Sequence, residues 1–261
     1  RTPSPIDLAF TLMRKDYTLN LHEDLPDCSY QVTVLELLKC NLDGLSQHMT
    51  LFEENVLWYQ DQFNEFVERS RFGDRQKSHI CLAFFNVLQE LFALYESLPN
   101  SNVVAEVIKD VMKKVYLVTG LKNPQQVYVG LFESYLKSGG IDWDFVNDIL
   151  DEQHRSIRNV LVNQLTIELV QDMTPAIFDW LLSDQAALLR LVDVLSAQKS
   201  EIQNQIVTSL KDSGQPSSVL LILAKLNNVD VFKTLIDSFR DKSVINNYNF
   251  IIPTISGIYL T

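Results

Sequence analysis

The sequence predicts an all-α protein built from antiparallel helix pairs, on three observations. Apolar residues recur at intervals of three and four nearly from end to end, which is the spacing that places them on one face of a helix. The 261 residues include only 8 Gly and 8 Pro, whereas all-β chains need many tight turns and therefore more of both. Apolar residues make up 46% of the chain, which is enough for a substantial core.

Residues 1–30 are expected to form an irregular leader that contains one short amphipathic helix, from Ile6 to Tyr17. Ser4 is a good N-cap for this helix. Pro5 suits the first helical position, because the missing N–H of proline costs no hydrogen bond there. The Pro26-Asp27 pair is expected to end the leader.

Residues 31–68 carry the most regular pattern in the chain and predict one long N-terminal amphipathic helix. The apolar side chains that form this stripe are Val32, Leu35, Leu38, Leu42, Leu45, Met49, Phe52, Val56, Tyr59, Phe63 and Phe66. Their period near 3.5 indicates a single helical face that packs against the rest of the protein. Gly44 is the expected place for a break or kink, because glycine costs about 1 kcal/mol relative to alanine inside a helix.

Further amphipathic helices complete the segment 31–173. The residues that mark their starts and ends are, in chain order, Ser78, Pro99-Asn100, Ser101 or Asn102, Gly120, Asn123-Pro124, Gly139-Gly140 and Asp142. The helix that Asp142 opens is expected to run to Leu169.

Residues 174–261 change to shorter helices. Their expected starts are Thr174-Pro175, Asp184, Ser200, Pro216, Asn228 and Ser243. Ser200 and Gln203 have the spacing of a capping box. Each of these helices is too small to bury its apolar face alone, so antiparallel pairing is expected.

This last region resembles the HEAT and armadillo class of α-solenoids. The resemblance is carried by Pro175, Ser200, Pro216 and Asn228 at helix starts, each followed by an apolar stripe. It implies an irregular α-solenoid of stacked helix pairs that binds other proteins along a helical face. Pair length varies and no residue-level repeat consensus is present, so no functional residue is carried over.

Charge and cysteine content limit the partners and the compartment. The net charge of −11 lies within residues 1–200, and residues 201–261 are neutral. An acidic chain repels phosphate backbones, so nucleic acid is not expected as the main ligand, and basic proteins or peptides are the better match. Three cysteines do not indicate a disulfide framework, and no apolar run reaches the roughly 18 residues of a membrane helix. We therefore expect an intracellular protein, in the cytoplasm or nucleus, without a membrane span.

The densest carboxylate cluster consists of Asp142, Asp144, Asp148, Asp151 and Glu152. Its spacing does not fit a calcium loop, because Val146 and Asn147 occupy the positions that need an oxygen ligand and a glycine. A magnesium-dependent all-α enzyme of isoprenoid-synthase type, centred on residues 142–152, is a remote alternative. The simpler interpretation is a solvated helix face whose first acidic residues interact with the helix dipole.

A basic cluster and one aromatic residue complete the candidate binding residues. The cluster consists of Arg69, Arg71, Arg75 and Lys77. It suits an acidic peptide or a phosphate, but a solvated connection between two helices is the commoner explanation. Trp58 lies beside the 31–68 stripe and not on it, so it is the best candidate for an exposed anchor, although core burial is the commoner explanation.

No metal, cofactor or catalytic residue is predicted. The four histidines and three cysteines lack the closely spaced pairs of a metal site, and His79 and Cys81, two residues apart, would point to different faces of a helix. No Gly-rich phosphate loop and no nucleophile elbow occur in the sequence. Cys81 lies in an apolar helical run, which is typical of a buried structural thiol.

The sequence therefore predicts a non-catalytic interaction scaffold, or a subunit of a larger complex, that binds proteins or peptides along a helical face. The alternative is a compact helical bundle that serves as a tether or assembly subunit, which the unbroken 31–68 stripe favours. Small-angle scattering separates the two, because a solenoid is elongated while a compact bundle follows the globular scaling of radius with length.

Overall fold

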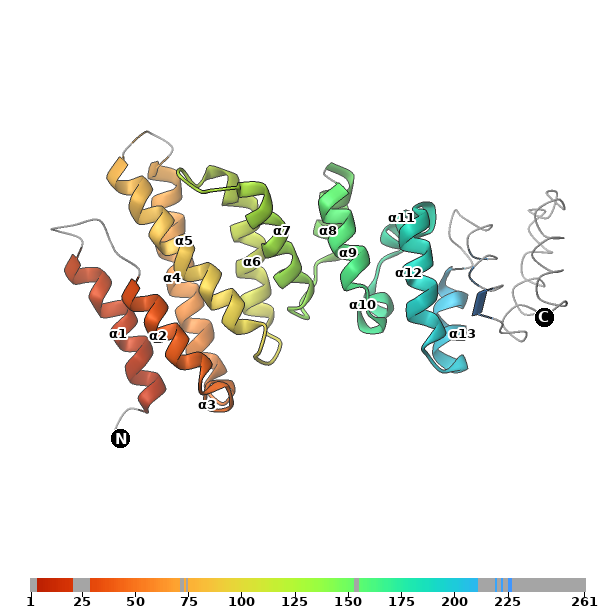
Figure 1. Cartoon of the computed structure of the whole chain (residues 1–261), viewed down its shortest axis with the longest axis horizontal. Helices are drawn as coiled ribbons and strands as arrows, with labels where there is room; N and C mark the ends of the chain where they lie inside the picture. The colour runs from red at the N-terminus through yellow and green to blue at the C-terminus, as the bar shows by residue number, and fades with distance from the viewer. Residues whose placement is uncertain are drawn as a thin grey trace, which may run out of the picture. The chain divides into compact units, whose positions relative to one another are not determined.

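The computed structural model describes residues 4–20, 29–70, 73, 75–152 and 155–210, together with residues 219, 222, 225 and 226. These residues form thirteen α-helices and one 3-10 helix, and no strand occurs among them (Figure 1). The predicted all-α class is thus confirmed for this part of the chain. Contacts divide the chain into two compact units, Arg1–Ile141 and Asp142–Thr261. The boundary lies inside the predicted 31–173 segment.

Helix α1 (Pro5–Asn20) begins where the sequence predicts, with Ser4 at its N-cap. The Ser4 hydroxyl accepts a hydrogen bond from the Asp7 backbone N–H at 3.1 Å, and the Asp7 carboxylate accepts one from the Ser4 N–H at 2.8 Å. This reciprocal pair satisfies two N–H groups at the helix start. Phe10 and Met13 are buried, as expected for an amphipathic helix.

The stripe of residues 31–68 is distributed over three helices, so the prediction of one continuous helix is wrong. These helices are α2 (Ser29–Lys39), α3 (Leu42–Ser46) and α4 (Met49–Ser70). Asn41 explains the first break, because its side-chain oxygen accepts a hydrogen bond from the Gly44 N–H at 3.2 Å and so starts a new helix. Gly44, the expected break point, lies inside α3 instead.

The stripe nevertheless forms one buried face, as predicted. Its buried members are Leu35, Leu38, Leu45, Phe52, Val56, Tyr59 and Phe63. The remaining members, Val32, Leu42, Met49 and Phe66, are half-buried. The interruptions between the helices therefore keep the apolar side chains on the same side of the chain.

Helices α4 and α5 (Arg75–Tyr95) lie side by side at the centre of the first unit (Figure 1). Aromatic side chains fill their contact. The ring centres of Phe63 and Phe85 lie 5.8 Å apart, and Phe66 stacks on Phe84 at 5.8 Å. Such pairs contribute about 0.5–1.5 kcal/mol beyond the area they bury, so this contact is a major source of stability.

One segment of α5, Lys77–Tyr95, is long and apolar enough by composition to cross a membrane, and it is the only such segment among the described helices. In this structure 61% of the segment is buried inside the protein. The helix packs against α2 and α4, which is the environment of a central core helix.

The first unit ends with α6 (Asn102–Lys114), a single 3-10 turn, η1 (Val115–Leu117), and α7 (Pro124–Leu136). Gly120 follows η1 with φ 83°, and Gly139 follows α7 with φ 75°. Both glycines have the positive φ that glycine adopts at low cost. Gly139 lies at the predicted end of α7, but Gly120 does not directly follow a helix as predicted, because α6 ends at Lys114 and the residue after η1, Val118, is extended.

Of the two helix caps predicted in this region, one is confirmed and the other is wrong. The Ser101 hydroxyl accepts a hydrogen bond from the Val104 N–H at 3.3 Å, so the predicted cap of α6 is confirmed. Asn123 occupies the N-cap position of α7 in the left-handed conformation, with φ 51°, and its side chain makes no cap hydrogen bond. The start of α7 is thus predicted correctly, but the expected side-chain cap is wrong.

Three helices open the second unit, where the sequence predicts one helix from Asp142 to Leu169. They are α8 (Trp143–Glu152), α9 (Arg155–Gln164) and α10 (Ile167–Asp172). The Arg158 guanidinium donates to the Leu150 carbonyl at 2.9 Å and so satisfies an acceptor that the end of α8 leaves open. The Thr166 hydroxyl accepts from the Leu169 N–H at 3.4 Å and caps α10.

The last helices of the described chain are α11 (Pro175–Ser183), α12 (Gln185–Ser196) and α13 (Ser200–Leu210). The starts of α11 and α12 are those predicted, and the Asp184 carboxylate accepts from the Ala187 N–H at 2.9 Å. The predicted capping box of α13 is wrong, because the Gln203 N–H donates to the Lys199 carbonyl at 3.1 Å, which makes Ser200 the first helical residue and not the N-cap. The Gln203 amide donates instead to the Leu195 and Gln198 carbonyls, at 3.0 Å each, and joins α13 to the end of α12.

The helix starts predicted at Pro216, Asn228 and Ser243 lie outside the described residues. The stacking of helix pairs into a solenoid stays a prediction.

Candidate functional site

The predicted carboxylate cluster lies on and just before α8, and its members differ in role. One oxygen of Asp142 accepts two backbone N–H groups of the first helical turn, at 3.1 and 3.2 Å. Asp144 and Asp148 are exposed on the helix. Asp151 and Glu152 belong to α8, but their side chains lie outside the described part of the structure.

These positions favour the structural interpretation of the cluster for its first members. Asp142 is a cap, and Asp144 lies in the first turn, where a negative charge interacts favourably with the helix dipole. Within the described residues, no group of three or more His, Cys, Asp or Glu side chains is placed to hold a metal ion. The magnesium-enzyme alternative gains no support from these residues.

The predicted basic cluster flanks the connection between α4 and α5. Arg69, in the last turn of α4, forms an ion pair with Glu65 at 2.9 Å. Arg75 is exposed at the start of α5, and Lys77 is half-buried two residues later. Arg71 lies outside the described residues. Arg69, Arg75 and Lys77 therefore belong to the ends of two helices and not to the connection in which the sequence places them, and Arg69 is engaged within its own helix.

Trp58 is half-buried on α4, and its ring packs against the aromatic core. The ring lies edge-on to Tyr59 with a centroid distance of 4.9 Å, and edge-on to Phe84 at 6.1 Å. These contacts favour the core role over the exposed anchor.

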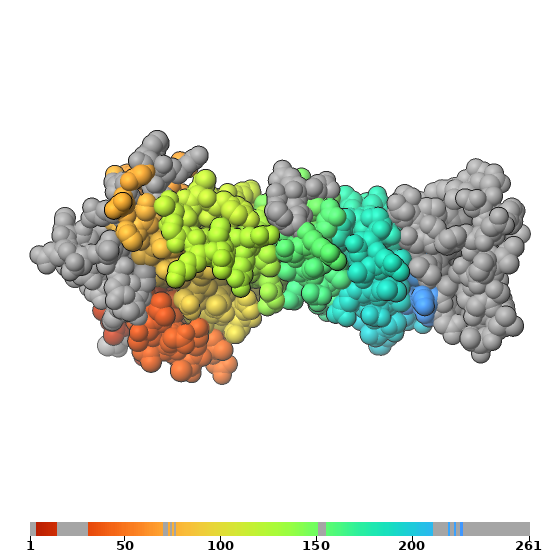
Figure 2. Space-filling model, turned by 45° about the horizontal axis from the view of Figure 1, so that its top comes forward, coloured from red at the N-terminus to blue at the C-terminus, as the bar shows by residue number. Residues whose placement is uncertain are grey.

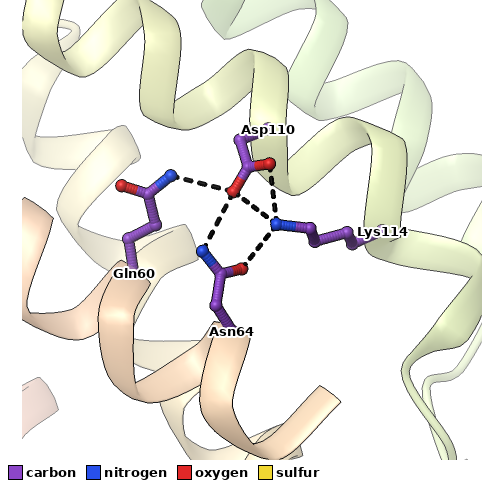
Figure 3. Close-up of polar contacts among 4 residues, drawn as sticks. All are labelled: Gln60, Asn64, Asp110 and Lys114. Carbon is purple, nitrogen blue, oxygen red and sulfur yellow. Dashed lines mark hydrogen bonds and ion pairs between the residues drawn. The ribbon is translucent and has the colours of Figure 1, made fainter. Parts of the chain in front are cut away.

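A polar cluster that the sequence did not single out joins α4 to α6 (Figure 3). The Asp110 carboxylate accepts hydrogen bonds from the Gln60 amide at 2.9 Å and the Asn64 amide at 3.2 Å. Lys114 forms an ion pair with Asp110 at 2.7 Å and also donates to the Asn64 side-chain oxygen at 2.8 Å. All four side chains are thus held by one another.

The charge of Asp110 is stabilised by this cluster. Partial burial alone would raise the pKa of Asp110, but the hydrogen bonds from Lys114, Gln60 and Asn64 outweigh it and leave the pKa below its ordinary value. The signal in the sequence was the spacing of four residues within each pair, which puts both members on one helix face. The contact between the two pairs depends on how α4 packs on α6.

A second polar network surrounds the Tyr95 hydroxyl. The Ser101 backbone N–H donates to this hydroxyl, which in turn donates to the Ser138 carbonyl at 3.1 Å. The Ser101 hydroxyl donates to the Glu53 carboxylate. Burial raises the pKa of Tyr95, and the negative charge of Glu53 acts in the same direction. A neutral phenol therefore links the ends of α5, α6 and α7.

The described histidines and cysteines differ in exposure. Cys81 is buried, as predicted, and Cys40 is exposed. His48 Nδ1 lies 2.8 Å from the Gly44 carbonyl oxygen, within hydrogen-bond distance. The other predicted non-ligands, His22, Cys28 and His154, lie outside the described residues.

Helix α1 exposes an apolar face that the sequence analysis did not identify. Leu8 and Leu12, one helical turn apart, are 51% and 37% exposed. The opposite face of α1 packs on α4: the Phe10 and Phe52 ring centres lie 6.3 Å apart, and the Tyr59 hydroxyl donates to a main-chain carbonyl of α1 at 3.2 Å. The outer leucines are therefore not needed to hold α1 in place.

Further large apolar side chains are exposed elsewhere, and they are Leu37, Leu57, Tyr116 and Leu189.

Comparison with protein-family models, with curated protein sequences and with solved structures finds no match to this chain. The resemblance to HEAT and armadillo solenoids therefore stays a prediction.

Proposed function

We propose that this protein is a non-catalytic interaction scaffold, or a subunit of a larger complex, that binds partner proteins along a helical face. The observation that carries the proposal is the outer face of α1, where Leu8 and Leu12 are exposed one turn apart. Single exposed apolar residues are ordinary, but apolar residues four apart on a helix are the pattern of anchors that enter a partner's groove.

The two leucines supply part of the energy of recognition. Full burial of a fully exposed leucine side chain contributes about 1.5–3 kcal/mol. Because Leu8 and Leu12 are already about half buried, a partner that covers both gains roughly 1–3 kcal/mol of the roughly 8 kcal/mol that corresponds to a micromolar complex, and the other contacts of the interface supply the larger share.

The charged and polar side chains of the two networks described above bond to other parts of the protein, which supports the same proposal. Asp110 and Lys114 hold each other and the amides of α4, and Tyr95 and Glu53 bond the cap of α6. These side chains act as connections between helices. The net charge of −11 supports a basic partner, because opposite potentials accelerate encounter and suppress wrong pairings.

Affinity purification of the full chain from cells that express it naturally tests the proposal. The comparison is between the wild type and a double variant, Leu8→Ser with Leu12→Ser. We expect a protein partner in near-stoichiometric amount with the wild type and its loss with the double variant, which should melt normally because both side chains are exposed.

Leu189→Ser is the matched control, because it removes an exposed leucine of the second unit. The same partner should be recovered with this variant. Absence of a stoichiometric partner for the wild type, or full recovery with the double variant, would contradict the proposal.

A further inference from the structure

The outward side of α4 carries a short line of exposed side chains. Glu54, Leu57 and Asp61 follow one another at spacings of three and four residues, which places them on one face of the helix. All three are exposed, and the exposed fraction of Leu57 is 41%. Because α4 is a continuous helix of 22 residues, their common direction follows from helix geometry.

The helices that pack on α4 leave this line uncovered. The buried side chains Phe52, Val56 and Phe63 lie on the opposite side of the helix, toward the core. Helix α7, whose yellow-green residues form a continuous part of the surface in Figure 2, packs on α5 and α6. The line therefore faces outward from the first unit.

The charge along this side of α4 is negative. The helix contains five carboxylates and one cation, Arg69. Arg69 pairs with Glu65 at 2.9 Å. In the described part of the structure, the side chains of Glu54 and Asp61 form no ion pair. The charge available to attract a partner is therefore that of Glu54 and Asp61.

The polar cluster beside this line does not cancel its charge. Asn64, three residues after Asp61, accepts a hydrogen bond from Lys114 at 2.8 Å (Figure 3). Lys114 also lies 2.7 and 2.8 Å from the two carboxylate oxygens of Asp110. The positive charge of Lys114 is thus balanced by Asp110, and the two carboxylates of the line keep their negative potential.

Leu57 gives the line an apolar centre, because it lies one helical turn from each carboxylate. Trp58, the next residue, is half-buried, and its ring packs edge-on against Tyr59 and Phe84. The apolar surface at this level of α4 is therefore partly fixed in advance, and a partner that covers Leu57 removes apolar surface from water at a small ordering cost.

We propose that the line of Glu54, Leu57 and Asp61, the α4 face, docks a basic amphipathic helix of a partner protein. Glu54 and Asp61 are two helical turns apart, about 10 Å along the axis. A partner helix with Lys or Arg one turn to each side of an apolar residue has the same spacing. Its apolar residue covers Leu57, and its cations pair with the two carboxylates.

This inference rests on the proposed function, because it names one kind of partner for the scaffold. It concerns a different helix from the outer face of α1, so each surface can be removed by its own variants.

Fluorescence anisotropy with the full chain tests the inference. The probes are two labelled synthetic helical peptides of equal length, which carry leucines on one face. One peptide has Lys one turn to each side of each leucine, and the other has Glu there. We expect tighter binding of the basic peptide, with an affinity that falls as salt rises.

Reversal of the local charge should reverse this preference. The double variant Glu54→Lys with Asp61→Lys should weaken binding of the basic peptide at least about tenfold and strengthen binding of the acidic one. Leu57→Ser should weaken binding of the basic peptide about fivefold. Both variants should melt like the wild type, because all three side chains are exposed.

The matched control is Asp193→Lys with Glu201→Lys, which makes the same change of net charge at two exposed carboxylates of the second unit. It should leave the preference for the basic peptide in place. Equal binding of the two peptides by the wild type, or an equal loss with the control, would overturn the inference. So would a wild-type dimer that the α4 double variant dissociates in sedimentation, because a second copy would then occupy the face.

The two proposals fail in different ways. If a natural partner is lost with the α1 double variant but no variant of the α4 face affects the basic peptide, only this inference is wrong. If the peptide binds as expected but no natural partner is recovered with the wild-type chain, the proposed function is wrong.

Discussion

Leu45 shows how much one residue in the apolar stripe contributes. It is completely buried in α3, between the two interruptions of the stripe. Its side chain has no polar partner there, so a charge at this position would be buried without compensation.

We predict that Leu45→Asp unfolds or aggregates the protein, with a loss of about 4 kcal/mol or more. Leu37→Asp makes the same change at a leucine that is 67% exposed, and should cost less than about 1 kcal/mol. Thermal melting and the soluble fraction measure both. A soluble Leu45→Asp protein with a normal melting temperature would refute the burial of this face.

Asp110 gives a prediction with a defined pH dependence. Because its pKa is lowered in the folded state, its contribution to stability is present above its ordinary pKa of 3.8 and is lost as the pH falls through the lower folded value. Asp110→Asn should therefore cost about 1 kcal/mol at pH 7, an amount that allows for the partial exposure of the group. The difference should disappear in strong acid.

Urea unfolding of the wild type and Asp110→Asn across this pH range measures the effect. Glu106→Gln is the control, because Glu106 pairs with Lys109 on the same helix but is exposed. It should have little effect at any pH, since exposed pairs contribute little. A constant difference between wild type and Asp110→Asn down to strong acid would show that the ionised carboxylate is not the cause.

Single residues differed in how well the sequence predicted them. Ser4 and Ser101 were recognisable as caps because a cap acts within three residues of its own position. The contact of Asp110 with Gln60 and Asn64 joins residues about fifty positions apart, and no local pattern encodes it. Exposure of Leu8 and Leu12 likewise depends on which face of α1 meets α4.

At the scale of helices, the apolar period predicted the buried face and not the continuity of the helix. The 31–68 stripe is buried although Asn41 starts a new helix inside it. A period near 3.5 indicates which side chains share a face, and short breaks between helices leave that shared face unchanged. The sequence does not show whether the Asn41 side chain will bond to the Gly44 N–H, whereas the helix cost of glycine is known in advance. The break was therefore expected at Gly44 instead.

Substitution by alanine should change the stability of the protein in opposite directions at two glycines, one inside α7 and one after it. Gly130→Ala should stabilise the protein by about 0.5–1 kcal/mol, because the residue is helical and its Cβ would meet no atom. Gly139→Ala should destabilise it by about 1–2 kcal/mol, because Gly139 has a positive φ and its Cβ would overlap the Asn100 side chain. Thermal unfolding of both variants decides this, and a shift of the same sign in both would contradict the assigned conformations.

At the scale of the whole molecule, the chain consists of two compact units with a boundary between Ile141 and Asp142. The sequence placed its division at 173/174, where helix length changes, because composition and rhythm do not record which helices contact each other. The contacts between helices define the units directly, since α4, α5 and α6 contact one another, and α11 and α12 form a separate set of contacts.

We predict that residues 1–141 fold without the second unit. The buried side chains of α4 and α5 pack against each other and against α1, α2 and α6, all within this unit. Circular dichroism of the isolated segment should show a helical spectrum and a cooperative melt. A gradual, non-cooperative loss of signal would show that the first unit depends on the second.

The mass of the native particle that contains this chain in a cell extract tests the central claim most directly. A scaffold or complex subunit should run well above the mass of its own polypeptide, measured by denaturing electrophoresis of the same extract, with a different protein present in a fixed ratio. A native particle of the mass of that single polypeptide, without a companion in any extract in which the chain is abundant, would contradict the account.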